Sequence, residues 1–290
     1  MAGTINIGGV RYLNARPLVY GLQEEPGVNL RLEYPRDLSP LLRSGEVDAA
    51  LLPAIEYFRL AAEGAERSRA HRSIAPEGSA ARASAAFLAL PVAAIGSRGA
   101  VGSVRLFGYT EPDRVRRVLL DAHSRTSNAL AQVIAAHRLG ISPHFVLPEE
   151  AAKTPGREPD AELVMGDPGL VAARPKAKWI LDLGMEWERL THLPFIYAFW
   201  VVRAGGPVAR LSALLAAARD RGLAAREEIV AMSPAEFGVP ADLARRHIFE
   251  QVQYTFGQRD RDGLRAFLRL AAEEGLAPDG VRLQMAREGE

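Results

Sequence analysis

Residues 47–52 read Val-Asp-Ala-Ala-Leu-Leu, a run that is apolar everywhere except at Asp48. A strand without apolar–polar alternation is typical of a parallel sheet that is covered by helices on both faces. Two further short apolar strands precede this run, at 4–9 and 30–34, and amphipathic segments lie between them. The alternation of strands and helices predicts an α/β fold with a parallel sheet.

A second series of strands and helices follows the glycine-rich segment at 96–103. Hydrophobic periodicity predicts helices over 126–139 and from Asp167 onward. The chain becomes almost entirely helical after the glycine pair at 205–206. Apolar runs predict the remaining strands at 85–95, 104–107, 115–121, 161–166, 179–183 and 195–202.

This layout predicts two α/β lobes, in which the second is inserted into the first. The first lobe would combine 1–95 with 200–290, including the C-terminal helices, and the second would comprise 96–199. Such a division agrees with about 150 residues per domain in a chain of 290 residues. Clefts between lobes are common small-molecule sites, so we expect the ligand there.

Composition excludes several classes of protein. Lys plus Arg number 36 and Asp plus Glu 35, so the basic excess of a nucleic-acid-binding protein is missing. The absence of cysteine excludes disulfides, thiolate metal sites and cysteine nucleophiles. No run approaches the roughly 20 apolar residues of a membrane span. The N-terminus passes directly into a strand without a signal-peptide pattern, so we expect a cytoplasmic protein without membrane or nucleic-acid partners.

The common motifs of catalysis and cofactor binding are also missing. There is no phosphate-binding loop, no dinucleotide fingerprint, no His-Glu-x-x-His and no nucleophile elbow. The histidines are scattered along the chain. We therefore expect neither a metal nor a cofactor.

Hydroxyl residues gather where the strand at 115–121 gives way to the next helix. Ser124, Thr126 and Ser127 stand at the start of this helix. Hydroxyls and unpaired N–H groups at a helix N-terminus can bind a carboxylate. A helix cap made by one of them is the simpler interpretation, and the pattern leaves both open.

Other candidates occupy turns at the ends of strands. Arg11 and Asn14 lie between the first strand and the first helix, where open α/β sheets bind ligands. Asn14 can equally cap the helix, and Arg11 can equally be a solvated surface residue. Ser103 follows three glycines, and Gly166-Asp167 joins a strand to a helix that Asp167 can cap. An aromatic cluster of predicted core residues includes one or two that can line the cleft: Trp187, Phe195, Tyr197, Phe199 and Trp200.

Taken together, these segments resemble the chorismate dehydratases of the futalosine route to menaquinone. The resemblance covers roughly residues 4–270, and the order and spacing of its motifs make it specific. The motifs are Tyr12-Leu-Asn14-x-x-Pro17-Leu18, Gly45-x-x-Asp48, Gly99-Ala-Val-x-Ser103, Leu120-Asp121-x-x-Ser124-Arg-Thr126-Ser127, Gly166-Asp167 and Trp187-x-x-x-Thr191-x-Leu193-Pro194-Phe195.

The resemblance implies a two-lobed fold of the type II periplasmic-binding-protein kind and a lyase that removes water from chorismate. It implies that Asn14 and Ser103 are the catalytic side chains, which hold the substrate for elimination. Thr126, Ser127 and the adjacent N–H groups would bind a carboxylate. The remaining substrate-binding positions that it implies are Arg11, Ser124, Gly166, Asp167, Leu193 and Pro194.

Two positions depart from the family pattern. His192 stands where glycine is usual, and Pro168-Gly169 replaces smaller residues. Alternatives are the sister enzyme, 1,4-dihydroxy-6-naphthoate synthase, a non-catalytic solute-binding protein and, less favoured, the effector lobe of a transcription regulator. The sequence leaves open whether the protein is a monomer or a homodimer.

Overall fold

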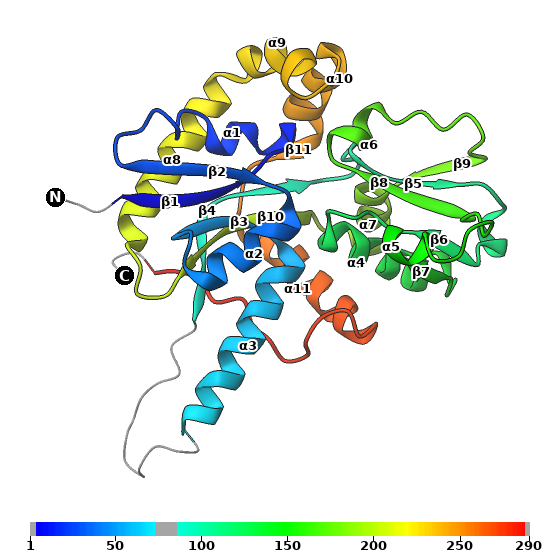
Figure 1. The fold of residues 1–290 in the computed structure, drawn as a ribbon, viewed down its shortest axis with the longest axis horizontal. Helices are drawn as coiled ribbons and strands as arrows, with labels where there is room; N and C mark the ends of the chain where they lie inside the picture. The colour runs from blue at the N-terminus through cyan, green and yellow to red at the C-terminus, as the bar shows by residue number, and fades with distance from the viewer. Residues whose placement is uncertain (1–3, 73–85, 288–290) are drawn as a thin grey trace.

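The computed structural model describes residues 4–72 and 86–287 and contains two β-sheets in two lobes (Figure 1). All strands of the second sheet lie between 104 and 182, and all strands of the first lie outside that range. The second lobe is thus inserted into the first, as expected. Ala85, the predicted first residue of one strand, and the chain ends assigned to the first lobe lie outside the described residues.

The first sheet is mixed rather than parallel throughout. Its order is β11-β4-β10-β3-β1-β2. The strands are β1 (Ile5–Val10), β2 (Val28–Glu33), β3 (Ala49–Pro53), β4 (Phe87–Ser97), β10 (Phe195–Arg203) and β11 (Val252–Gln253). β1 pairs in parallel with β2 and β3, as predicted, whereas β10 is antiparallel to β3 and β4. The prediction of a parallel sheet is therefore wrong for this half, because the chain leaves the lobe along β4 and returns beside it along β10.

The second sheet has the order β7-β6-β8-β5-β9. Its strands are β5 (Val104–Gly108), β6 (Arg117–Leu119), β7 (His144–Val146), β8 (Ala161–Met165) and β9 (Trp179–Asp182). β6 is parallel to β7 and β8, and β5 is antiparallel to β8 and β9. Periodicity did not predict β7, a short strand whose first residue is exposed.

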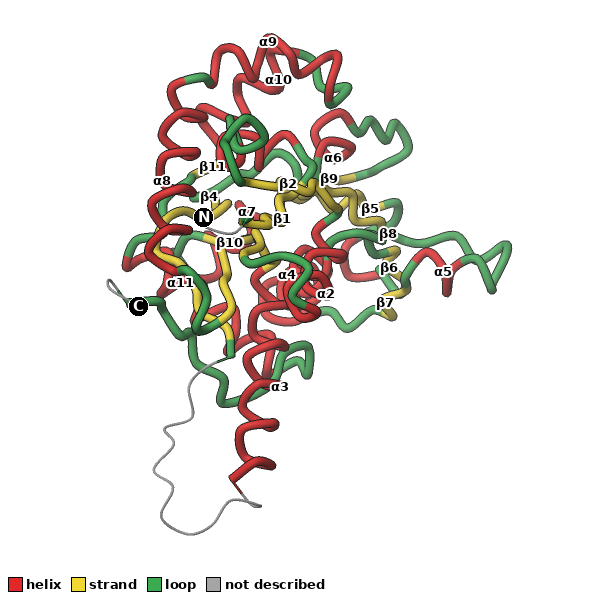
Figure 2. The backbone as a smooth tube through the Cα atoms, turned by 60° about the vertical axis from the view of Figure 1, so that its left-hand side comes forward, coloured by secondary structure: helices red, strands yellow, loops and turns green. Residues whose placement is uncertain are grey.

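Helices cover both faces of the first sheet (Figures 1 and 2). α1 and α8 pack together on one face, and α2, α3 and α11 lie on the other. The α-helices of the first lobe are α1 (Arg16–Val19), α2 (Pro35–Ser44), α3 (Ala54–Arg72), α8 (Val208–Ala224), α9 (Arg226–Glu236), α10 (Ala241–Arg246) and α11 (Gln258–Glu273). The second lobe holds α4 (Arg125–Ile134), α5 (Pro148–Ala151), α6 (Asp167–Val171) and α7 (Leu183–Thr191).

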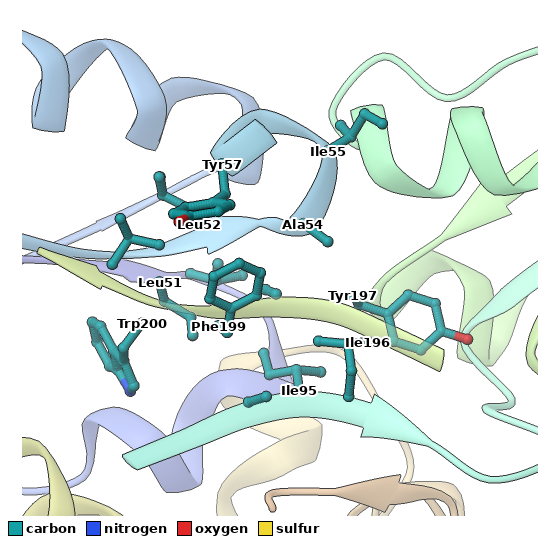
Figure 3. Packing of buried hydrophobic residues seen from close by; sticks show 14 of the residues in the cluster. Leu51, Leu52, Ala54, Ile55, Tyr57, Ile95, Ile196, Tyr197, Phe199 and Trp200 are labelled. Atoms are coloured by element: carbon teal, nitrogen blue, oxygen red, sulfur yellow. The ribbon is translucent and has the colours of Figure 1, made fainter. Parts of the chain in front are cut away.

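The core of the first lobe is centred on β3 and β10, which are buried along nearly their whole length. Tyr57 of α3 packs edge-on against Phe199 of β10, with ring centroids 5.2 Å apart. Figure 3 shows this contact and, near the start of β10, the ring of Tyr197. The other four residues of the predicted aromatic cluster are core residues, as expected, and each is at most 1% exposed: Trp187, Phe195, Phe199 and Trp200.

The end of α7 explains one departure from the family pattern. His192 has φ = 57°, and it is the only residue other than glycine with a positive φ in 4–72 and 86–287. Its N–H donates to the Glu188 carbonyl and closes the helix in the left-handed cap that usually contains glycine.

Replacement of His192 by glycine is expected to raise the free energy of unfolding by about 1 kcal/mol, because a left-handed conformation is costly for a residue with a Cβ. Urea unfolding followed by circular dichroism measures this change. The control is His144→Gly in β7, where the backbone is extended and glycine should destabilise. A His192→Gly protein less stable than the parent would contradict the cap interpretation.

Candidate active site

A small cavity with a volume of about 30 Å³ lies between the two lobes. Its lining is mostly apolar and comes from strand ends and helix starts of both lobes. Among the described residues, no charged side chain lines it. The polar side chains in the lining are those of Tyr12, Asn14, Ser103, Ser124, Ser127 and Tyr197.

Asn14 lies in a short 3₁₀ turn, Leu13–Ala15, directly after β1 and before α1. Its side chain makes no cap hydrogen bond, because the cap of that turn is Tyr12 and that of α1 is Ala15. Asn14 Oδ1 is buried and has no hydrogen-bond partner among the described residues. Leaving a buried acceptor unpaired costs about 1–3 kcal/mol, which a ligand that donates to Oδ1 would recover.

Ser103 reaches the same cavity from the other lobe, where it immediately precedes β5. The residue is 1% exposed, and its Oγ likewise has no partner in the described part of the chain. The cavity therefore places two unpaired oxygens, one from each lobe, on its surface. Gly169 of α6 packs on the Ser103 backbone, because a Cβ at Gly169 would come within 2.3 Å of the Ser103 carbonyl oxygen.

Ser124 and Ser127 form the end of the cavity at the N-terminus of α4. Ser124 is the cap: its Oγ accepts from the Ser127 N–H at 3.2 Å and donates to Ser127 Oγ at 2.9 Å. The Ser127 hydroxyl therefore keeps its own proton for a ligand. The cap interpretation is confirmed for Ser124, and the binding of an anion by Ser127 stays a prediction.

Thr126 and Arg11 do not line the cavity. Thr126 Oγ1 accepts from the Ile55 N–H at 3.2 Å, so this hydroxyl joins α4 to the start of α3. Arg11 is exposed, and its guanidinium lies 4.6 Å from the centre of the Tyr34 ring. Thr126 therefore forms one of the hydrogen bonds that link the two lobes in this structure.

Gly166 lines the cavity and joins β8 to α6 with φ = 70° and ψ = −151°, a conformation that only glycine adopts readily. The Tyr12 ring covers it, 3.0 Å from where a Cβ would stand. Asp167 caps no helix, because Gly166 holds the cap position of α6. Its carboxylate instead accepts from the Leu13 N–H across the cleft, at 3.0 and 3.3 Å.

Burial raises the pKa of Asp167 to about 7, although the Leu13 N–H and the Arg11 guanidinium oppose the shift. Since the folded state holds this proton more tightly than the unfolded state, stability present at low pH is lost between about pH 4 and 7. The expected slope is at most about 1.4 kcal/mol per pH unit. The Asp167→Asn protein should lack this loss.

Urea unfolding of the parent and the variant at pH 5 and pH 8 tests this expectation. The buried Asp121, whose pKa is also raised by burial, is common to both proteins and cancels in the difference. Parallel pH profiles for the two proteins would show that Asp167 is not the responsible group.

Leu193 and Pro194 lie on the link between α7 and β10, away from the cavity lining. The Pro194 carbonyl accepts from Trp187 Nε1 at 3.2 Å. Gly263 of α11 packs on the same carbonyl, since a Cβ there would come within 2.0 Å of it. In this structure Leu193 and Pro194 pack beside the aromatic core next to β10.

The lining also contains residues that local sequence reasoning did not assign to the site, such as Pro35, Pro53 and Met165. Each stands at or beside the end of a strand or the start of a helix, which is the only signal that could have identified it. Tyr12 belonged to the quoted motif, and burial raises the pKa of its phenol, so it stays neutral at the cleft.

No group of three or more potential metal ligands occurs within 4–72 and 86–287. Over the same residues, no helix is both long and apolar enough to cross a membrane. The polar groups that line the cavity are amide, hydroxyl and backbone groups.

The chain has a two-lobed α/β fold like that of the periplasmic binding proteins. The structure resembles that of a protein from Archaeoglobus fulgidus, with a TM-score of 0.67 and 15% identity over 94% of this chain and 98% of that one. It also resembles the periplasmic aliphatic sulphonate-binding protein SsuA from Escherichia coli, with a TM-score of 0.60 and 15% identity over 100% and 96% of the two chains.

In sequence, the chain is 27% identical over 278 residues to a chorismate dehydratase from Thermus thermophilus, covering 90% of this chain and 93% of the relative. The family described as menaquinone biosynthesis matches residues 5–65 and 69–273. The chain belongs to this menaquinone biosynthesis family.

Proposed function

We propose that the protein is a chorismate dehydratase, a lyase that converts chorismate to 3-[(1-carboxyvinyl)oxy]benzoate in the cytoplasm. The observation that carries the proposal is the pair of unpaired oxygens, Asn14 Oδ1 and Ser103 Oγ, in a cavity lined by no described charged side chain. The family and the curated relative give the substrate.

The reaction removes a proton from ring carbon C3 and hydroxide from C4, and the ring becomes aromatic. Aromatisation supplies the driving force, so the protein has mainly to hold the substrate and select this elimination. Positioning alone can lower a barrier by up to about 7–11 kcal/mol in ideal cases. Amide and hydroxyl groups are sufficient for such a task.

In this proposal Asn14 and Ser103 orient the ring and the departing hydroxyl from opposite lobes. Asn14 Oδ1 accepts a hydrogen bond from the substrate hydroxyl, and Ser103 Oγ can accept or donate one. Ser127 and the N-terminal N–H groups of α4 bind a substrate carboxylate, where the helix dipole favours negative charge. The substrate's own side-chain carboxylate, held near the ring, takes the proton from C3 and passes it to the hydroxyl that departs from C4, which leaves as water.

The lobes would close over the substrate and exclude water. In this structure they already touch through Thr126 and Asp167. We propose the limits of the lobes as 1–95 with 200–290 for the first and 96–199 for the second. β10, which starts at Phe195, contributes its beginning to the crossing between them.

Incubation of the purified protein with chorismate, without metal or nucleotide, tests the proposed function. Chromatography and mass spectrometry should detect a product about 18 mass units lighter than chorismate, with new aromatic absorbance. Unchanged chorismate would overturn the proposal. A thermal-shift screen would then separate the sister synthase activity from simple solute binding, to which the likeness to SsuA would point.

A further inference from the structure

The loop that carries Ser103 joins β4 to β5 and lacks regular secondary structure at Ala100 and Val101. Two of its residues, Gly99 and Gly102, have φ values of 76° and 75°. Ser103 Oγ has no partner among the described residues, so its position depends on the backbone that precedes it. Whatever holds this loop therefore also fixes Ser103 relative to a substrate.

One carboxylate holds the loop from the side of the second lobe. Asp182, the last residue of β9, accepts from the Val101 N–H at 3.0 Å through Oδ1 and from the Gly102 N–H at 2.6 Å through Oδ2. Oδ1 also accepts from Gly184 and Met185, at 3.0 and 3.1 Å, and caps α7. A helix cap needs only the last two contacts, so the contacts to Val101 and Gly102 serve the loop.

Two side chains of the π-helical segment His247–Gln251 hold the loop from the side of the first lobe. Gln251 packs against Gly102, since a Cβ there would come within 2.3 Å of Gln251 Oε1. His247 is 1% exposed and lies against the Val101 backbone. Burial lowers the pKa of His247 to about 4, so the imidazole is neutral at physiological pH.

We propose that Asp182 is a positioning residue, which sets the place of Ser103 Oγ in the cavity through the N–H groups of Val101 and Gly102. This inference rests on the role proposed above for Ser103. Asp182 does not line the cavity and touches no substrate. Its effect on turnover therefore passes through the residues that it holds rather than through contact with the substrate.

The Asp182→Asn variant tests this inference because it keeps Oδ1, and with it the cap of α7, while it replaces Oδ2 by an amide that faces the Gly102 N–H. We expect kcat for chorismate to fall about 10- to 100-fold, as for a small displacement of a reacting group, with KM changed less than about threefold. Hydrogen exchange of the amides at 98–104 should become faster. The matched control is Asp260→Asn, at a buried carboxylate that accepts from Gly257 in the first turn of α11, and it should leave kcat and loop exchange unchanged.

A double variant separates positioning from a general structural effect. Ser103→Ala alone should lower kcat, and adding Asp182→Asn to it should lower kcat no further. Additive losses, or unchanged kcat in Asp182→Asn beside an impaired Ser103→Ala, would overturn this inference and leave the proposed function intact. Full turnover by Ser103→Ala, or unchanged chorismate with the parent protein, would overturn the role of Ser103 and the inference together.

Discussion

Replacement of Asn14 by leucine is expected to lower kcat/KM for chorismate about 100- to 1,000-fold, the usual cost of removing one preorganised polar group at a reacting centre. Leucine keeps the branched shape of asparagine and replaces the amide oxygen and nitrogen by methyl groups. Because Asn14 Oδ1 has no partner among the described residues, the folded protein should lose no stability. Steady-state kinetics together with thermal unfolding measure the two quantities.

Asn29→Leu is the matched control for this variant. Asn29 is an exposed residue of β2 in the same lobe, where its side chain donates to Asn6 Oδ1 at 3.0 Å. The same change of side chain at this site should leave kcat/KM unaltered. Parent-like turnover by Asn14→Leu would remove Asn14 from the proposed mechanism.

Replacement of Ser127 by aspartate should abolish binding of chorismate, with KM raised at least about 100-fold. The new carboxylate would stand in the cavity at the end of α4, where we propose that a substrate carboxylate binds. Like charges repel strongly where water is excluded. The helix itself should tolerate the change, because an acidic residue is favourable in a first turn.

The Ser127→Ala variant supplies the comparison. It removes the hydroxyl without adding charge, so a loss of about tenfold is expected, in line with one hydrogen bond. Isothermal titration with chorismate measures both variants. Equal affinities for the aspartate and alanine variants would show that the substrate carboxylate binds elsewhere.

Local patterns in the sequence were sufficient for most of the fold. The apolar run at 47–52 predicted β3, and the glycine-rich segment at 96–103 contains the turn between β4 and β5. The pair Ser39-Pro40 has the form of a helix start, a cap followed by proline, but α2 begins at Pro35 and Pro40 is accommodated inside it. Both prolines suit a first turn, so only the packing of the buried Ser39 distinguishes them.

The candidate site was predictable where a single turn carries the chemistry. Asn14, Ser103 and the hydroxyls of α4 fall at strand ends, and the structure brings Asn14, Ser103, Ser124 and Ser127 to one cavity. The partner of Asp167 could not be predicted, because Leu13 lies 154 residues away along the chain. Contacts of this kind depend on how the two lobes pack against each other. A local sequence pattern carries no information about that packing.

The uncharged lining has a consequence for the basicity of whatever binds in the cavity. The loss of water and the lack of a cationic side chain in the described lining both favour the protonated form of a carboxyl group. Burial already has this effect on Asp167. A substrate carboxylate near the ring would thus gain proton affinity on entering the cleft. The lobes would contribute no basic side chain of their own. They would instead make the weakly basic carboxylate of the ligand a stronger base.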